Sequence, residues 1–323
     1  MRVLEQPPFM TRHLASLGIL TLTLIVSACA PTPRIVKIGL VAPFEGRYRQ
    51  IGYDVIPAAR LAAREFAALE TRRDMIIEIV AYDDQGDPSR AIEQARRLVV
   101  DPEVKIVIGH WRDETTQAAV KVYASAGLPL ITYSSQDIES PYRVMNLAPS
   151  HAALQAAVRR WLGRQSKLGD IMIESDADDI MTIVDEYLSV REQNQTELIV
   201  GGPDWGLSQF KWLAQQQVES AYFVTGSPRP GDSADQYWSH KNLARFVEGF
   251  KEGSLGAQPG MLSIAAYEAT WLAISRVSSG EVVSPNAKWT LDSNFDDTGR
   301  LVDQPIYLYQ WTNGLPVLVE VVR

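Results

Sequence analysis

The side chains that most often perform chemistry are few in this sequence, and they form no known catalytic pattern. The chain has 4 histidines and 1 cysteine. It contains no Gly-x-Ser-x-Gly turn, no phosphate-binding loop ending in Gly-Lys-Ser/Thr and no His-Glu-x-x-His pair. Asp83, Asp84 and Asp87 could hold Ca²⁺, but their spacing is not that of an EF-hand. We therefore expect no enzyme, no cofactor and no metal site.

The one cysteine lies where it can carry a lipid. Arg2 and Arg12, an uncharged run over residues 14–26 and small residues before Cys29 are the three parts of a secretory signal. The run is too short to span a membrane, which takes about 20 residues. The Val-Ser-Ala-Cys stretch resembles a bacterial lipobox, in which the cysteine is lipidated and begins the mature chain. The alternative is a buried cysteine beside an ordinary cleavage site.

Composition narrows the class of protein further. The 323 residues are 46% hydrophobic and 22% charged, with a net charge of −8, an ordinary globular mixture. One cysteine cannot form a disulfide framework, and the acidic balance argues against binding to nucleic acid. The length suggests two domains at roughly 100–200 residues each. With residues 1–28 as a signal peptide and 29–34 as a tether, we expect a monomer in the cell envelope, lipid-anchored to a bacterial membrane.

Strands and helices alternate in the first half of the chain. The strands are short and almost continuously apolar, at residues 35–41, 76–82, 104–108 and 128–132, with helices at 57–69, 87–99 and 114–126 between them. Such strands predict a parallel sheet covered on both faces. Ligands of these sheets bind at the carboxyl ends of the strands. We therefore expect the binding loops to be residues 42–53, 83–87, 109–114 and 133–141.

Three stretches in this half resemble a known family. They are KIGLVAPFEGRYRQIGYD, AYDDQGDPSRAIEQARRLV and KIVIGHWRDETTQAAVKVYASAGLPLITYSS, which resemble the first lobe of type I periplasmic binding proteins, in the branched-chain amino-acid (leucine/isoleucine/valine) and amide group. VMNLAPSHAALQAAV, IVGGPDWG, AYFVTGSP and AAYEATWLAI resemble later landmarks more weakly. The resemblance implies an α/β fold of two lobes, each a parallel sheet flanked by helices, that close on a ligand.

The second half follows this pattern with fewer elements. Residues 35–147 would form the first lobe and residues 148–279 the second. Between residues 162 and 197 there is room for one βα unit where the resemblance implies about two. Asn313-Gly314 lies between two β-rich runs and predicts a hairpin. We expect residues 280–323 to be a C-terminal segment that carries this hairpin and returns to the lobes.

The resemblance also implies ligand contacts in the first lobe. Amino-acid binders of the family hold the ligand carboxylate with a small hydroxyl residue before the third helix, and Asp113 stands there in this chain. Its carboxylate would repel a ligand carboxylate. The alternative is a plain helix N-cap. Ser134, Ser135 and Gln136 follow as hydroxyl and amide contacts, or as an ordinary turn. Tyr48 is an aromatic candidate, or a surface residue like its neighbours Phe44, Arg47 and Tyr53.

Three further candidates come from the second half of the chain. Asp204 aligns with the acidic residue that receives a ligand ammonium group in the family. Trp205 beside it would give an apolar wall or a cation–π face. The alternative for both is a Gly-Pro-Asp turn with a packed tryptophan. Tyr267 stands where the family has an aromatic cleft residue, or it belongs to the core of its helix.

These features predict a solute-binding lipoprotein of an ABC importer. Its ligand would be small, polar or amphipathic, and amino-acid- or amide-like, and it would be passed to ABC permease subunits. Because of Asp113, a simple α-amino acid is less expected here than in the family. The alternative is a non-transport ligand sensor or envelope scaffold lipoprotein with a degenerate cleft. An exported enzyme is disfavoured because no catalytic constellation is present.

Overall fold

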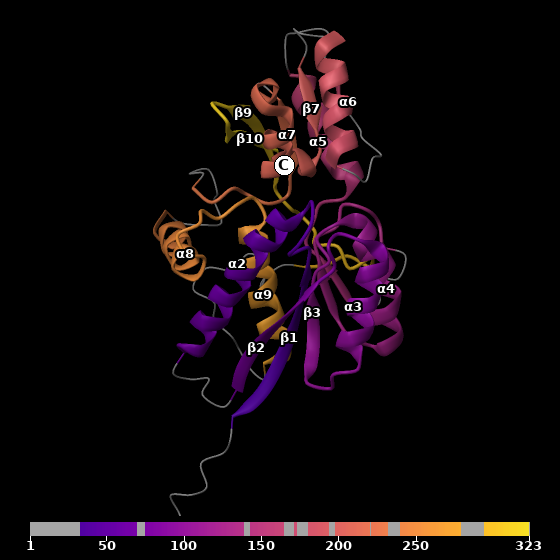
Figure 1. Ribbon diagram of the computed structural model, residues 1–323, viewed down its shortest axis with the longest axis vertical. Coiled ribbons are helices and arrows are strands. Elements are labelled where there is room, and N and C mark those ends of the chain that lie inside the picture. The colour runs from indigo at the N-terminus through magenta and orange to yellow at the C-terminus, as the bar shows by residue number, and fades with distance from the viewer. Residues whose placement is uncertain are drawn as a thin grey trace, which may run out of the picture.

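A computed structural model describes residues 33–69, 75–138, 143–164, 171–172, 180–193, 198–219, 221–231, 240–278 and 294–322. They form two lobes along the long axis of the molecule, each built on a five-stranded sheet (Figure 1). The predicted signal peptide, Cys29 and most of the tether lie outside the described residues. Within the described ranges, no helix is both long enough and apolar enough to cross a membrane.

The first sheet is parallel throughout, as predicted. Its strand order is β2-β1-β3-β4-β5, with β1 Arg34–Ala42, β2 Met75–Asp83, β3 Val104–Ile108, β4 Leu130–Thr132 and β5 Val144–Asn146. Leu40 packs on one face with residues of α2 (Arg49–Ala67). Val41 packs on the other with α3 (Pro88–Val99) and α4 (Asp113–Ala126). Because both faces are covered, these strands carry apolar residues at successive positions.

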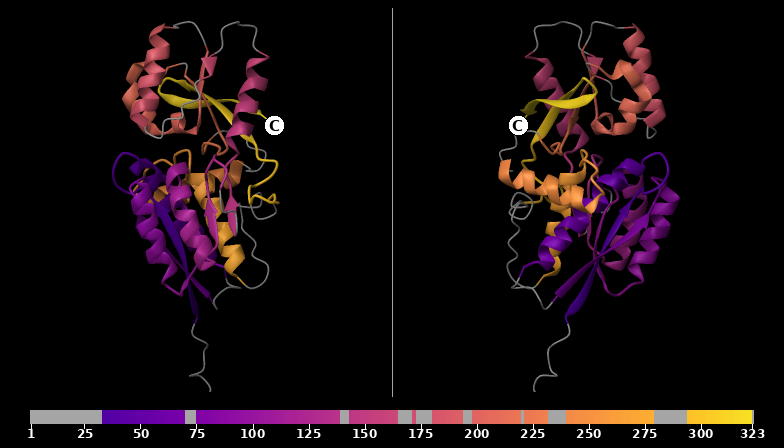
Figure 2. Two further views of the ribbon diagram at one scale, coloured as in Figure 1. Left: turned by 90° about the vertical axis from the view of Figure 1, so that its right-hand side faces the viewer. Right: turned by 60° about the vertical axis from the view of Figure 1, so that its left-hand side comes forward.

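Two helices predicted for the second lobe instead belong to the first. We expected residues 148–279 to form the second lobe, but α9 (Ser263–Val277) packs against α2 and touches β3 and β4. α8 (His240–Gly253) also lies beside α2, as Figure 2 shows. α9 is buried at every position from Ser263 to Ile274. A helix that is buried on all sides needs neighbours on all sides, and α2 and the first sheet provide some of them.

The second sheet is mixed rather than parallel throughout. Its order is β10-β9-β8-β7-β6, with β6 Ile171–Met172, β7 Ile199–Gly201 and β8 Tyr222–Thr225 parallel. β9 (Ile306–Thr312) and β10 (Leu315–Val322) form the predicted antiparallel hairpin. Asn313 and Gly314 both have positive φ, 50° and 67°, as a type I′ turn requires. A two-residue turn reverses the chain, so β9 and β10 pair antiparallel with each other, and β9 also pairs antiparallel with β8.

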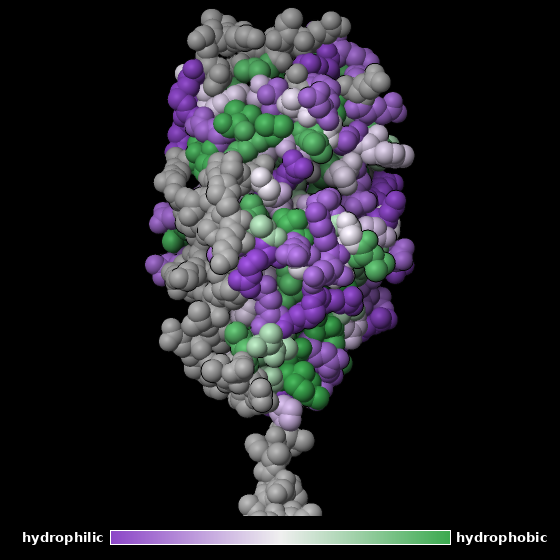
Figure 3. Space-filling view, turned by 90° about the vertical axis from the view of Figure 1, so that its left-hand side faces the viewer, coloured by the Kyte–Doolittle hydropathy of each residue, from purple (hydrophilic) through white to green (hydrophobic). Residues whose placement is uncertain are grey.

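The helices of the second lobe are α5 (His151–Leu162), α6 (Ile180–Gln193) and α7 (Ser208–Ala214). Between α5 and β7 the described residues contain one strand and one helix, β6 and α6, which is the single βα unit that the spacing allowed. The edge strand β10 exposes Leu315, Val317 and Val319. Figure 3 shows apolar atoms gathered on the second lobe on the side where β9 and β10 lie.

The chain passes between the lobes three times. It crosses from β5 to α5, from β8 to α8 and from α9 to β9. Before the last crossing, Arg300 forms an isolated parallel bridge with Asn146 at the end of β5. The C-terminal segment therefore adds to the first sheet before it enters the second, as the prediction of a segment returning to both lobes required.

Candidate ligand-binding site between the lobes

A cleft of about 720 Å³ lies between the two lobes, and we call it the interlobe cleft. Its walls come from the carboxyl ends of β3 and β4 in the first lobe and of β7 and β8 in the second. This is where parallel sheets bind ligands. Two of the four predicted loops, 109–114 and 133–141, supply much of the first wall. Loop 42–53 contributes Ile51, and loop 83–87 contributes none of the lining residues among those described.

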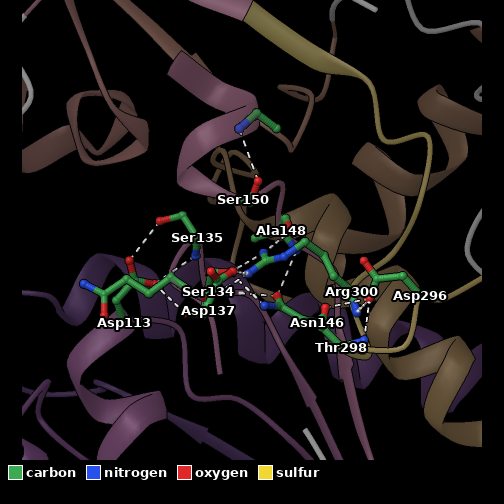
Figure 4. Close-up of polar contacts among 12 residues, drawn as sticks. Asp113, Ser134, Ser135, Asp137, Asn146, Ala148, Ser150, Asp296, Thr298 and Arg300 are labelled. Carbon is green, nitrogen blue, oxygen red and sulfur yellow. Dashed lines mark hydrogen bonds and ion pairs between the residues drawn. The ribbon is translucent and has the colours of Figure 1, made fainter. Parts of the chain in front are cut away.

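Asp113 and Ser135 line this cleft, and Asp113 bonds to both Ser135 and Ser134 (Figure 4). Ser134 is 1% exposed and is not a lining residue, so the prediction of a ligand contact is wrong for it. Ser134 Oγ donates to Asp113 Oδ1 at 2.6 Å, and the Ser135 backbone N–H donates to the same oxygen at 2.9 Å. Ser135 Oγ donates to Asp113 Oδ2 at 2.8 Å. The N-cap of α4 is Arg112, so the N-cap interpretation of Asp113 is wrong. The carboxylate instead joins α4 to the loop after β4.

The loop that carries the two serines is held from behind by Asn146 and Arg300 (Figure 4). Asn146 Nδ2 donates to the Ser134 carbonyl at 2.8 Å, and its Oδ1 accepts from the Ser134 N–H at 3.2 Å. Arg300 donates to the carbonyls of Ser134 at 2.9 Å, Ala148 at 2.7 Å and Gln136 at 2.8 Å. Gln136 lines the cleft with an exposed side chain. Arg300 was not predicted, since nothing links it in sequence to this loop.

Arg112 is the cleft cation that the sequence interpretation missed. Its Nη2 donates to Glu114 Oε1 at 2.8 Å, and its Nη1 lies 3.9 Å from Oδ2 of Asp204 in the second lobe. Burial lowers the pKa of Arg112, but the Asp204, Glu114 and Asp113 carboxylates outweigh burial and raise it. Arg112 therefore stays charged, and Asp204, predicted to receive a ligand ammonium group, faces this guanidinium.

The Tyr48 ring packs against the Arg112 guanidinium and does not form a wall of the cleft. The Arg112 guanidinium carbon lies 3.5 Å from the centre of the Tyr48 ring, a cation–π contact. The Tyr48 hydroxyl accepts from the backbone N–H of Ile180 at 2.9 Å, which joins the first lobe to the start of α6. Tyr48 is 6% exposed and is not among the lining residues, so the prediction of a ligand contact is wrong for it.

Trp205 borders the cleft but belongs to the core of the second lobe. Its side chain is 2% exposed, stacks on Phe210 with 4.6 Å between ring centres and meets Tyr187 edge-on at 4.9 Å. A Cβ at Gly201 would come within 2.1 Å of its ring, so this glycine lets the indole pack against β7. Trp205 is therefore a packed core side chain that also lines the cleft.

Tyr267 lies away from the interlobe cleft. It is fully buried in α9, where it meets Phe246 and Trp271 edge-on and its hydroxyl donates to the Glu65 carboxylate of α2. It is not a lining residue, so the prediction that Tyr267 contacts the ligand is wrong. The physical reason is the move of α9 into the first lobe, which turns this position into core.

Trp111 and Tyr133 form an aromatic floor that was not predicted. Both line the cleft, and their rings stack with 6.2 Å between centres. Trp111 is 6% exposed, and its indole N–H has no hydrogen-bond partner within the described ranges. Burial raises the pKa of Tyr133, which keeps its hydroxyl neutral. At Gly226 of the second lobe, an added Cβ would lie 3.0 Å from that hydroxyl, so this glycine permits the close approach.

The acidic loop at the end of β2 is occupied by protein donors. Asp83 Oδ1 accepts from the Phe44 N–H at 2.8 Å, and Asp87 caps α3 through the Arg90 N–H at 2.9 Å. Asp84 Oδ2 lies 2.6 Å from His110 Nδ1 in a fully buried pair. Among the described residues, no group of three or more His, Cys, Asp or Glu side chains could hold a metal ion.

The two lobes, their connections and the polar cleft between them define the class: this is the fold of type I periplasmic binding proteins. Residues 35–195 match a family model described as periplasmic binding protein.

Comparison with known proteins gives partial matches in sequence. The chain is 32% identical over 97 residues to the Leu/Ile/Val-binding protein of Escherichia coli (strain K12), covering 30% of this chain and 26% of that protein. It is 33% identical over 100 residues to the leucine-, isoleucine-, valine-, threonine-, and alanine-binding protein of Pseudomonas aeruginosa, covering 31% and 26%. The match therefore spans about a quarter of the length of these curated relatives.

Solved structures match over most of the chain. The branched-chain amino acid transporter substrate binding protein LivJ from Streptococcus pneumoniae, in complex with isoleucine, has a TM-score of 0.68 at 18% identity over 89% of this chain and 99% of that one. An ABC transporter solute binding protein from R. palustris, in complex with benzoate, has a TM-score of 0.63 at 14% identity over 89% and 96%. At these identities the likeness is one of fold.

Proposed function

We propose that this chain is the solute-binding component of an ABC importer, an extracytoplasmic lipoprotein that captures a small molecule and catalyses no reaction. The observation that carries the proposal is the interlobe cleft, whose two walls come from two sheets joined by three chain crossings. The family match over residues 35–195 supports it, as do relatives whose names state that they bind leucine, isoleucine and valine.

The ligand we propose is small, polar or amphipathic, and amino-acid- or amide-like. Apolar side chains of the second lobe, Ile183, Val200 and Val224, line the cleft opposite the polar groups around Asp113. The volume of about 720 Å³ suits a molecule of a few to about two dozen heavy atoms, since ligand pockets of roughly 300–1,000 Å³ enclose molecules up to drug size.

The mechanism we propose is capture and release without a covalent step. The ligand enters between the walls, and the lobes close about the three crossing segments, as hinge-closing proteins do. The closed form then docks on the permease subunits, and opening releases the ligand into the transport path. Contacts that already join the lobes, such as Arg112 with Asp204, contribute to the stability of the closed form.

Native mass spectrometry of the purified full-length protein, with matched variants at Gly202, tests this proposal. Gly202 lines the cleft, and an added Cβ there meets nothing within 4 Å. Its φ of −82° suits any L-residue, so Gly202→Trp should fill the cleft without straining the backbone. We expect a small molecule with the wild type and with Gly202→Ala, and none with Gly202→Trp. An equal ligand load on Gly202→Trp, or no ligand on any of them, would contradict the proposal.

A second candidate is a non-transport sensor or envelope scaffold lipoprotein. Direct contacts between the lobes favour it: Ile180 N–H donates to the Tyr48 hydroxyl, and Gln209 Nε2 donates to the Arg47 carbonyl at 2.9 Å. A scaffold needs lobes that stay joined. Cross-linking in intact cells separates the two functions, because an importer component should be captured with permease subunits and a scaffold with other envelope proteins.

A further inference from the structure

The Asp113 carboxylate already receives the hydrogen bonds that a ligand carboxylate would need. The donors are Ser134 Oγ, Ser135 N–H and Ser135 Oγ, at 2.6, 2.9 and 2.8 Å. We call these three donors the anion seat. They come from one loop beside the N-terminal end of α4, where the helix dipole also favours a negative charge. Bonds from such donors to an ionised group are stronger than neutral ones, so a dissolved carboxylate must compete with a tethered one.

The remaining charges of the cleft also disfavour an anionic ligand. The lining residues include four carboxylates, those of Asp113, Glu114, Asp137 and Asp204, and one guanidinium, that of Arg112. Arg112 is already engaged, because it donates to Glu114 and lies 3.9 Å from Asp204. A ligand carboxylate would therefore add a fifth carboxylate to a partly enclosed space.

One buried donor in the cleft lacks an acceptor. The Trp111 indole N–H lacks a hydrogen-bond partner in the described part of the chain, and the side chain is 6% exposed. A buried polar group without a partner costs free energy that a ligand oxygen can recover. An amide carbonyl supplies that oxygen, and an amine supplies a positive charge to balance the acidic walls.

We propose that Asp113 acts as a built-in carboxylate that excludes ligand carboxylates, so that this cleft selects amines and amides without a free carboxylate. The ligand class rests on the solute-binding role proposed above, whereas the filled anion seat does not. Asp113 is then a specificity-determining residue, and its removal should open the seat to a carboxylate from solution.

Chemical rescue tests the seat without any knowledge of the natural ligand. The thermal unfolding midpoint is measured in 100 mM sodium formate and in 100 mM sodium chloride for the wild type, Asp113→Ala and Asp113→Asn. Formate should raise the midpoint of Asp113→Ala by at least 2 °C relative to chloride, because it binds the emptied seat of the folded state. The wild type and Asp113→Asn should show no such rise, because the side chain at position 113 still occupies the anion seat in both proteins. No rise for Asp113→Ala, or an equal rise for all three, overturns the proposal.

Calorimetry tests the ligand class with two probes that differ in one group. L-Leucinamide carries an amine and an amide, and L-leucine carries a carboxylate in place of the amide. The wild type should bind leucinamide at least ten times more tightly than leucine. Asp113→Ala should gain at least tenfold in affinity for leucine, and Asp113→Asn should not. Equal or tighter binding of leucine by the wild type overturns the selection, and so does wild-type leucinamide binding too weak to measure.

Two further measurements keep the outcomes distinct. Asp113→Ser is examined in parallel with Asp113→Ala, so that a folding defect in one variant does not remove the test. If the solute-binding role is wrong but the seat is as proposed, the Gly202 series carries no ligand while formate still stabilises Asp113→Ala. If formate has no effect while the Gly202 series behaves as expected, the seat proposal fails and the solute-binding role stands.

Discussion

Arg112 of the first lobe and Asp204 of the second face each other across the interlobe cleft, with 3.9 Å between Nη1 and Oδ2. The two side chains differ in environment: that of Arg112 is 5% exposed and that of Asp204 is 42% exposed. Arg112 is also bound to Glu114, whose side chain is 19% exposed. The interaction therefore joins a buried charge network in one lobe to a solvated carboxylate in the other.

Removing either partner of this pair should have unequal effects on stability. Asp204→Asn should lower the free energy of unfolding by less than about 1 kcal/mol, because a half-exposed ion pair contributes little. Arg112→Met should cost about 3 kcal/mol, because it leaves Glu114 without its guanidinium partner in a buried site. Urea unfolding of both variants measures the difference. Equal costs would show that Arg112 is stabilised by Asp204 rather than by its own lobe.

Tyr267 should affect stability and not ligand binding. Tyr267→Phe keeps the ring contacts with Phe246 and Trp271 and removes the hydrogen bond to Glu65, which should cost about 1 kcal/mol in unfolding free energy. Calorimetry with whichever ligand co-purifies should give an unchanged dissociation constant. The matched cleft variant Trp111→Phe should weaken binding instead. A large loss of ligand affinity in Tyr267→Phe would instead show that Tyr267 contributes to ligand binding.

Arg300 should hold the binding loop in place. It is 9% exposed and donates to the carbonyls of Ser134, Gln136 and Ala148. Arg300→Met should cost about 2–4 kcal/mol, since three carbonyls lose a charged donor. The control is Arg64→Met, which removes one exposed bond to the Gly249 carbonyl and should cost less than about 1 kcal/mol. Chemical denaturation compares them, and similar costs for both would argue against this role.

Asp54 should make stability depend on pH between about 4 and 7. Burial raises the pKa of its carboxyl to about 7, although N–H groups of Leu262 and Gly260 partly offset this by donating to it. The folded state then keeps a proton that the unfolded chain releases near pH 4, so the free energy of unfolding should fall as pH rises from 4 to 7. Three pKa units correspond to at most about 4 kcal/mol. Asp54→Asn should flatten this decline relative to the wild type, and parallel curves would contradict it.

Cys29 should determine whether the chain is anchored. Wild-type protein from a bacterial host should sediment with membranes and carry a lipid mass on a mature chain that begins at Cys29. Cys29→Ser should keep the signal peptide and lack the lipid, because the modified thiol is absent. Mass spectrometry of both proteins tests this, and an unmodified wild-type chain cut at another site would remove the lipoprotein prediction.

The first sheet and the C-terminal hairpin could be predicted from the sequence, because each leaves a local pattern of residues. Apolar strands such as β1 show that both faces of the first sheet are buried, and Asn313-Gly314 gives the hairpin. The lobe to which α9 belongs could not be predicted. A helix that is buried at every position from Ser263 to Ile274 has no polar face to reveal its neighbours. The misplacement of α9 also produced the wrong prediction for Tyr267.

The site could be predicted where its residues lie in a stretch of sequence that resembles the family. Asp113 and the serines were found because they lie in stretches that resemble the family, and Asp113 does bond to both serines, although Ser134 does not line the cleft. Arg112 was missed because the resemblance to the family pointed to its neighbour Asp113. Nothing in the sequence indicates that the Tyr48 ring packs against the Arg112 guanidinium. Arg300 was out of reach because it lies 166 positions from Ser134, a separation at which no local pattern operates.

The late position of α9 and Arg300 has a consequence for the order of folding. The first lobe uses residues 34–146 for its sheet, yet α9 and the bridge at Arg300 come after all but two of the strands that the structure describes. About 120 residues separate the end of β5 from the start of α9. During synthesis, the face of α2 that packs on α9 therefore stays uncovered while the second lobe except its hairpin is made. Contacts so far apart in sequence slow folding and prolong exposure of apolar surface. Aggregation before release from the ribosome or the export machinery should therefore begin at α2, in a lobe whose strands are already complete.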